Sequence, residues 1–237
     1  MSDPLTFESG IQDVDELSTF DSMQIYGPSG VGKTNLAASA IHAGFNRVLI
    51  VDIEGSAKGV GRMNPGVKRI QTPTFQHLDL VKNELLAKPD QVDFVIFDTM
   101  NRAGKLAVRH FQSLPQNANN KYAAWDELEK WTSDFMWSFH HSSIPTVFIF
   151  HALDDKNEQT GAIKTMPKFQ GSFKEDIPTI SDIVGYYNYE SDPDGNLHRT
   201  LYVGEAVNLV TKNRFGLPSK IVDPTIAKIN GLIDQAK

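Results

Sequence analysis

The chain contains no cysteine, and none of its hydrophobic runs is long enough to cross a membrane. Without cysteine it can form neither a disulfide nor a cysteine-ligated metal centre. A membrane helix needs about 18 apolar residues in succession, which this sequence never provides. The 7 histidines show no HExxH-like spacing, so a histidine-held zinc site is not indicated either. We therefore expect a cytoplasmic protein that does not contact membranes.

Basic residues are missing from the first 21 positions, which carry six acidic ones. This acidic amino-terminal segment accounts for the whole net charge of −6, because the rest of the chain holds 23 acidic and 23 basic side chains. Local patches rather than net charge therefore decide what the body attracts. The segment is either a solvated tail or a docking element for a neighbouring subunit, through Leu5, Phe7 and Ile11.

A complete phosphate-binding loop of the form GxxxxGK[ST] occupies residues 27–34. Its glycines free backbone N–H groups to surround nucleotide phosphates, Lys33 can reach the β- and γ-phosphates, and the Thr34 hydroxyl can bind Mg²⁺. An apolar run precedes the loop and a helical pattern follows it, which is the setting that the motif requires. We expect ATP and Mg²⁺ as cofactors. The residues expected to contact the nucleotide are Gly27, Pro28, Ser29, Gly30, Val31, Gly32, Lys33, Thr34 and Asn35.

Apolar runs alternate with helical patterns through the first two thirds of the chain. The longer runs lack polar residues at alternate positions, which is typical of parallel strands buried on both faces. Five runs predict strands, at 23–26, 47–53, 67–71, 92–98 and 145–151. Three stretches have helical periodicity, at 36–43, 78–86 and 122–139. This alternation predicts an α/β fold with a mostly parallel central sheet flanked by helices.

The pattern changes after residue 180. Two apolar stretches, 183–189 and 197–203, flank the turn sequence Asp-Pro-Asp-Gly-Asn, which predicts a β-hairpin. Residues 208–212 suggest one more strand, and residues 224–236 suggest a terminal helix. We therefore expect one P-loop domain over residues 22–237, with an antiparallel hairpin extension at its carboxyl end.

Three polar residues end predicted buried strands. Asp98 has the form of the carboxylate that holds Mg²⁺ through water, which normally ends a strand beside the P-loop strand. Glu54 is either the group that orients the attacking water or a turn glutamate. His151 is either a contact for the γ-phosphate or a local hydrogen-bonding residue.

The order of five motifs, GPSGVGKT, VDIEG, VIFDT, FIFHA and TKNRFG, resembles the RecA-like ATPase core over residues 22–218. The layout is most similar to small phage-encoded proteins of this family, some of which are ATP-dependent single-strand annealing proteins, and it implies the host cytoplasm. The resemblance implies that Glu54 is the catalytic glutamate, Asp98 the Walker B aspartate and His151 a sensor where relatives usually have glutamine. The RecA amino-terminal helix and carboxyl-terminal domain are missing, so strand exchange and processive unwinding are not implied.

The KNRFG sequence at residues 212–216 is similar to a motif of bacterial RadA and to the lysine/arginine element of DnaB-type helicases. The resemblance implies that Lys212 and Arg214 reach into the nucleotide site of a neighbouring subunit. A cation supplied in this way stabilises transition-state charge and makes hydrolysis depend on assembly. We therefore expect a homo-oligomer, either a ring or a filament. The alternative is a solvated basic pair in a β-turn.

Two acid-free stretches predict contacts with DNA. The first, residues 99–125, includes an expected flexible loop and follows the Mg²⁺ strand, and the second, residues 159–173, follows His151. Both match the DNA loops of RecA-like proteins in position. Basic side chains attract phosphates and an aromatic ring can stack on a base. The alternative is that the two stretches are solvated loops, which would have the same composition. The residues expected to contact single-stranded DNA are Arg102, Lys105, Arg109, Lys121, Lys164, Lys168, Phe169 and Lys174.

These features favour an oligomeric ATPase that binds single-stranded DNA in recombination, annealing or repair. A single-strand-binding protein or a replicative helicase is a further candidate partner. One alternative is an ATP-gated assembly module, such as a helicase loader, without direct DNA coupling. A small-molecule phosphotransferase would need an arginine-rich lid that the sequence lacks. The stretch at residues 211–214 lacks the aspartate that would bind guanine, which argues against GTP.

Overall fold

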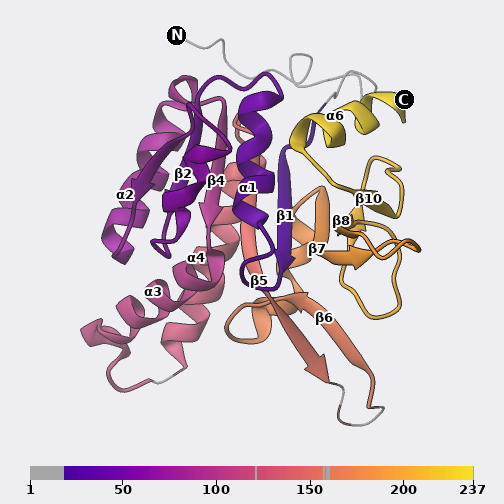
Figure 1. Cartoon of the computed structure of the whole chain (residues 1–237). Coiled ribbons are helices and arrows are strands. Elements are labelled where there is room, and N and C mark those ends of the chain that lie inside the picture. Colours follow the sequence, from indigo (N-terminus) through magenta and orange to yellow (C-terminus); the bar gives the residue numbers. More distant parts are fainter. Residues whose placement is uncertain (1–18, 121, 157, 159–160, 237) are drawn as a thin grey trace, which may run out of the picture.

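The computed structural model describes residues 19–120, 122–156, 158 and 161–236, and Figure 1 shows their arrangement. The acidic segment up to residue 18, and Lys121, lie outside these ranges. The strands are β1 (Ser22–Gly27), β2 (Val48–Asp52), β3 (Lys68–Gln71), β4 (Phe94–Asp98), β5 (Thr146–Lys156), β6 (Ile163–Pro167), β7 (Ile183–Ser191), β8 (Leu197–Tyr202), β9 (Lys212–Asn213) and β10 (Lys220–Val222). The helices are α1 (Lys33–Ala38), α2 (Phe75–Ala87), α3 (Met100–Gln112), α4 (Ala123–His140), α5 (Ile177–Ile180) and α6 (Ile226–Gln235). No helix in the described ranges has the length and apolar character needed to cross a membrane.

A mixed sheet of ten strands forms the centre of the fold. Six neighbouring strands, in the order β7-β1-β5-β4-β2-β3, are parallel, which confirms the expected α/β class. Beyond β7 the sheet continues with β8 and β10, both antiparallel to their neighbours, and β7–β8 is the predicted hairpin. Because the parallel strands run the same way, their carboxyl ends meet at one edge, where α/β folds bind ligands.

Both faces of β1, β2, β4 and the first part of β5 are buried, which explains the apolar runs in the sequence, whereas the edge strand β3 is exposed. In β4, Phe94 and Ile96 pack in the core on one face, whereas Val95 and Phe97 pack in the core on the other. Helices α1 and α6 cover the first face, and helices α2 to α5 cover the second. Phe20, which precedes β1, is fully buried against the edge of the Phe94 ring. The packed body therefore begins before residue 22.

The structure refines the sequence prediction in the two acid-free stretches. In the first, α3 begins directly after β4, so the basic residues at its start are helical, whereas the asparagines at positions 117, 119 and 120 lie in the connection between α3 and α4, where the loop was expected. Gly104 weakens the helical pattern of the sequence because glycine is unfavourable within a helix. The structure explains why glycine is present, since a side chain there would collide with the Phe169 ring. In the second stretch, β5 continues past His151 and pairs with β6 as an antiparallel ribbon, which extends away from the rest of the sheet (Figure 1). The strand expected at 208–212 is reduced to the two residues of β9.

Candidate nucleotide site

The phosphate-binding loop joins β1 to α1 at the carboxyl edge of the sheet. Gly30 and Gly32 have φ angles of 80° and 102°, a region that glycine adopts readily because it has no side chain. With Glu54 and His151, the loop lines a cavity of about 500 Å³. A cavity of this size beside a glycine-rich loop suits the phosphates of a nucleotide.

Lys33 is buried and held by the loop itself. Its Nζ donates hydrogen bonds to the carbonyl oxygens of Gly27, over 3.0 Å, and Pro28, over 2.7 Å. Burial lowers the pKa of Lys33 to about 8, although the negative charges of Asp98 and Glu54 act in the opposite direction. A phosphate beside the ammonium would favour its charged form. The geometry therefore allows Lys33 to exchange two carbonyl contacts for phosphate oxygens.

Thr34 and Asp98 place two oxygen ligands side by side. Thr34 Oγ1 donates to Asp98 Oδ2 over 2.7 Å, and Asp98 is only 2% exposed. Burial raises the pKa of Asp98 to about 6, and the nearby Asp52 and Glu54 carboxylates act in the same direction. A buried carboxylate and a hydroxyl are oxygen donors of the kind that Mg²⁺ prefers, so these residues fit the expected metal.

One detail of the Asp98 prediction is wrong. We expected its strand to lie beside the P-loop strand, but β5 lies between β1 and β4. Contact is made instead through the start of α1, where Thr34 meets the end of β4.

Asp52 turns the chain after β2 and thereby positions Glu54. Its carboxylate accepts hydrogen bonds from the N–H groups of residues 55–57, at 2.7 to 3.2 Å, and pairs with Arg69 over 2.6 Å. The Glu54 N–H donates to the Asp98 carbonyl over 3.2 Å. Glu54 is therefore fixed at the end of β4, next to the proposed metal ligand.

Glu54 and His151 face one another across the end of the sheet. Glu54 Oε1 lies 3.3 Å from His151 Nε2, and the two side chains are 39% and 29% exposed. Both line the cavity beside the phosphate-binding loop. The structure thus brings together five residues that the sequence predicted separately, namely Lys33, Thr34, Glu54, Asp98 and His151.

Asn101 connects several elements at this edge of the sheet, but sequence reasoning did not identify it. It is 5% exposed, and its Oδ1 accepts a hydrogen bond from the His151 N–H over 2.7 Å. Its Nδ2 donates to the Lys168 carbonyl over 2.6 Å. The Lys168 N–H in turn donates to the His151 carbonyl over 2.8 Å. Asn101 therefore ties the start of α3 to His151 on β5 and to the segment after β6.

Arg199 on β8 is a second residue that sequence reasoning missed. Its Nε donates to the Val31 carbonyl in the phosphate-binding loop over 3.0 Å. Its guanidinium carbon lies 5.4 Å from the centre of the Tyr189 ring, and Nη2 donates to the Tyr189 hydroxyl over 3.2 Å. The hairpin therefore braces the loop from within the same chain, through a contact between residues 168 positions apart.

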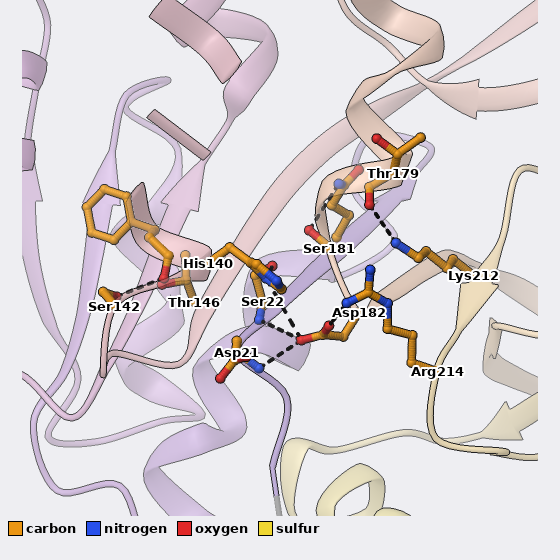
Figure 2. Close-up of polar contacts among 12 residues, drawn as sticks. Asp21, Ser22, His140, Ser142, Thr146, Thr179, Ser181, Asp182, Lys212 and Arg214 are labelled. Carbon is orange, nitrogen blue, oxygen red and sulfur yellow. Dashed lines mark hydrogen bonds and ion pairs between the residues drawn. The ribbon is translucent and has the colours of Figure 1, made fainter. Parts of the chain in front are cut away.

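Lys212 and Arg214 lie at the opposite edge of the sheet, near the start of β1. Arg214 Nη1 is 2.9 Å from Asp182 Oδ1, and Lys212 Nζ donates to the Thr179 carbonyl over 2.6 Å. Figure 2 shows both side chains directed toward a polar cluster formed by Thr179 and Asp182, which also contains Asp21 and Ser22. The structure therefore does not bring them to the nucleotide site of their own chain.

The residues predicted to contact DNA divide into several groups. Arg102, Lys105 and Arg109 lie on α3 rather than in a loop. On the ribbon side, Lys164 and Lys168 are exposed, whereas Lys174 pairs with Asp155 over 2.9 Å. Lys121 lies outside the described residues.

The prediction for Phe169 is wrong. We expected its ring to stack on a base, but the residue is 6% exposed. The ring packs against Phe150 and sits where a side chain on Gly104 would lie. Phe169 is therefore a core residue that joins the segment after β6 to α3.

Comparisons with known proteins agree with this geometry. Residues 19–215 match the model of a family described as an AAA domain. The fold is similar to the crystal structure of the RadB recombinase, with a TM-score of 0.53 and 16% sequence identity over 85% of each chain. A KaiC-like protein from Pyrococcus horikoshii OT3 gives a TM-score of 0.49 and 12% identity over 86% of this chain and 89% of that one. No curated protein sequence matches the chain. The RadB likeness confirms the RecA-like fold.

Proposed function

This chain belongs to the AAA domain family, and we propose that it is an ATPase that binds single-stranded DNA in recombination, annealing or repair. The observation that carries the ATPase proposal is the convergence of five predicted residues: Lys33, Thr34, Glu54 and His151 line one cavity, and Asp98 accepts a hydrogen bond from Thr34. A phosphate-binding loop, a metal-binding oxygen pair and a candidate base lie within a few side chains of one another. That combination is what phosphoryl transfer to water requires.

Each residue at this edge has a role in the proposed hydrolysis. When bound, Mg²⁺ would neutralise charge on the β- and γ-phosphates. Thr34 and Asp98 would hold it, the latter through water, and Lys33 would turn from its two carbonyl partners to phosphate oxygens. Glu54 would orient the attacking water and accept its proton. His151, which contacts Glu54 and lines the same cavity, would contact the γ-phosphate.

Completion of the site by a neighbouring subunit is the second part of the proposal. Lys212 and Arg214 lie at the opposite edge of their own sheet, so they can reach a nucleotide only if it belongs to another copy of the chain. Arg214 is 50% exposed despite its pair with Asp182, which leaves part of the guanidinium accessible. A head-to-tail ring or filament would bring this edge against the phosphate-binding loop of the next subunit.

An ATP-gated assembly module is the alternative, in which a protein partner takes the place of DNA. The observation that favours DNA is the set of exposed cations near Glu54 and His151, on α3 and beside β6. An assembly module needs no such cations beside its catalytic residues. The two functions therefore differ in whether turnover responds to a polyanion.

Steady-state ATP turnover with and without single-stranded DNA tests the proposal. Lys33→Ala serves as the blank, and Glu54→Gln should bind nucleotide but fail to turn it over. We expect DNA to increase the turnover of the wild-type protein severalfold. Turnover that ignores DNA would support the assembly module, and no turnover above the Lys33→Ala blank would reject the ATPase itself.

A further inference from the structure

A second cavity lies behind the catalytic pair, on the side away from the phosphate-binding loop. It has a volume of about 440 Å³ and is lined by the start of α3, the ends of β2 and β3, and both Glu54 and His151. We call it the α3 pocket. Because Glu54 and His151 also line the nucleotide cavity, they form a wall that the two cavities share.

Two cations that have no side-chain partner in the described part of the chain line the α3 pocket. Arg102 and Lys105 are three positions apart on α3 and therefore lie on the same face of the helix. Among the described residues, neither forms a hydrogen bond or an ion pair through its side chain. Arg102 is nonetheless half-buried, and a guanidinium removed from water normally has a hydrogen-bonding partner.

The Thr99 hydroxyl is a third group without a partner. Thr99 lines the pocket and is 2% exposed, yet within the described structure its Oγ1 forms no hydrogen bond. It precedes α3 at the N-cap position without capping the helix. The first N–H groups of an α-helix have no partner within it, and together with the helix dipole they favour an anion.

The carboxylates of the α3 pocket are already engaged. Asp52 accepts three backbone N–H groups and pairs with Arg69, and Glu54 contacts His151. Among the described residues, the lining groups that form no side-chain hydrogen bond or ion pair are therefore two cations, the Thr99 hydroxyl and the exposed Gln71 amide. This set suits a phosphate oxygen cluster better than a cation or an apolar ligand.

We propose that the α3 pocket binds a phosphate group, and that the group is a backbone phosphodiester of single-stranded DNA. This inference rests on the proposed function for its choice of DNA over free phosphate. The exposed Lys168 lies beside the pocket, since Asn101 Nδ2 donates to the Lys168 carbonyl, and it extends the line of positive charge. The two stretches that the sequence marked as acid-free thus meet at one place.

The position of the pocket also gives a route from DNA to turnover. A phosphate beside His151 can accept a hydrogen bond from the imidazole ring that now contacts Glu54. Glu54 is then released toward the nucleotide cavity, where it can orient water. DNA occupancy and catalysis are coupled through one side-chain pair rather than through a long-range change of shape.

Arg102→Gln combined with Lys105→Gln tests the pocket, with Lys130→Gln as the control. Lys130 lies on α4 and is exposed, and it does not line the pocket. The probe is a fluorescent oligothymidylate followed by anisotropy, with the phosphate-binding loop saturated by a non-hydrolysable ATP analogue. We expect the double variant to lose about tenfold in affinity, and its salt slope to fall by up to about 1.4, or about 0.7 for each lost phosphate contact. The control should lose much less.

Free phosphate is the other source of the same chemistry, and a second arm separates the two. Phosphorus NMR measures the binding of inorganic phosphate to the analogue-saturated protein. Loss of phosphate binding in the double variant, with oligothymidylate binding unchanged, would keep the anion site and reject DNA as its ligand. Unchanged binding of both probes would overturn the proposal.

Two further measurements keep these outcomes interpretable. The Arg102→Lys, Lys105→Arg variant preserves charge and should recover most of the oligothymidylate affinity, which a merely misfolded protein would not do. Melting temperatures check the fold of each variant. If the wild-type protein turns over ATP while the double variant binds both probes normally, the pocket inference fails and the proposed function stands. If the wild-type protein neither turns over ATP nor binds DNA, yet binds phosphate through this pocket, the anion site stands, whereas the proposed function and DNA as the ligand of the pocket both fail.

Discussion

The two ends of the central parallel strands each contain a buried carboxylate, but the partners of the two carboxylates differ. At the carboxyl end, Asp98 has the Thr34 hydroxyl as its side-chain partner, and burial raises its pKa to about 6. At the amino end, Asp182 accepts the N–H groups of Asp21 and Ser22 and pairs with Arg214. Both carboxylates are almost fully buried, at 2% and 5% exposure.

The carboxylate at the carboxyl end is not paired with a cation among the described residues, as expected of a ligand-binding site. The carboxylate at the amino end already has an ion pair and hydrogen bonds that compensate its charge. The amino-end cluster of Asp21, His140 and Asp182 has the spacing of a metal site, with ligand atoms within 4.8 Å of one another. Arg214 and two N–H groups already compensate Asp182, however, so a metal would compete with them (Figure 2). At the carboxyl end, Asp98 instead lies near two other carboxylates. Charge compensation, rather than residue type, distinguishes the two ends.

The largest expected effect joins the two ends across a subunit boundary. Arg214→Ala should retain nucleotide binding but lose about 10³-fold in ATP turnover, because the transition state loses a cation supplied in trans. Glu54→Ala should be equally inactive. Mixing the two proteins should restore activity, because a hybrid interface has an intact Glu54 from one subunit and an intact Arg214 from the next. Turnover is measured across mixing ratios, and the absence of rescue at every ratio would reject the role in trans.

The amino-end network should make a large contribution to stability. Asp182→Ala leaves two backbone N–H groups and Arg214 without their acceptor, which we expect to lower the free energy of unfolding by about 3 kcal/mol. Urea unfolding measures the change. Glu205→Ala, which removes an exposed carboxylate, is the control and should stay within about 0.5 kcal/mol of the wild type. An equally small effect of Asp182→Ala would show that the network is not a structural one.

Motifs and buried strands could be predicted from the sequence, because both are local patterns. The loop at residues 27–34 carries its own signature, and β2, β4 and β5 are continuous apolar runs because both of their faces are covered. The predicted positions of Glu54, Asp98 and His151 followed from the rule that parallel strands end at one edge.

The remaining features depend on contacts between distant parts of the chain. The glycine in α3 weakened the helical pattern because the Phe169 ring, 65 positions away, needs the space. The same contact buries Phe169, which the sequence presents as an aromatic residue among lysines. The hydrogen bonds that join Asn101 to His151 and Arg199 to the phosphate-binding loop connect residues at least 50 positions apart. No local pattern marks such residues.

The carboxyl end should gain stability when its buried charge is removed. The pKa of Asp98 in the folded protein, about 6, exceeds its ordinary value of 3.8. This group therefore contributes stability that is fully present below about pH 4 and is lost as the pH rises through about 6. Asp98→Asn should raise the free energy of unfolding by about 2 kcal/mol at pH 8 and change it little at pH 4. The shift sets an upper limit of about 3 kcal/mol.

Urea unfolding at the two pH values, without nucleotide or Mg²⁺, measures this gain. Glu129→Gln removes an exposed carboxylate and should show no such pH dependence. The same Asp98→Asn protein should be inactive in ATP turnover. Opposite changes in stability and activity from one substitution are expected of a site whose unfavourable charge serves ligand binding. A loss of stability at pH 8 would mean that the Asp98 carboxylate is structural, like that of Asp182.

The smallest expected effect concerns Asn101, which links His151 on β5 to the segment after β6. Asn101→Ala removes an acceptor for the His151 N–H and a donor to the Lys168 carbonyl. We expect ATP turnover to fall about tenfold and nucleotide affinity to change less than twofold, because Asn101 positions His151 without lining the nucleotide cavity. Asn101→Asp keeps the acceptor but loses the donor. If His151 placement alone matters, Asn101→Asp should restore basal turnover. If the link to Lys168 carries the DNA response, the same variant should keep basal turnover but lose its stimulation by DNA. An equal loss of turnover and nucleotide affinity in both variants would show that Asn101 contributes only to packing.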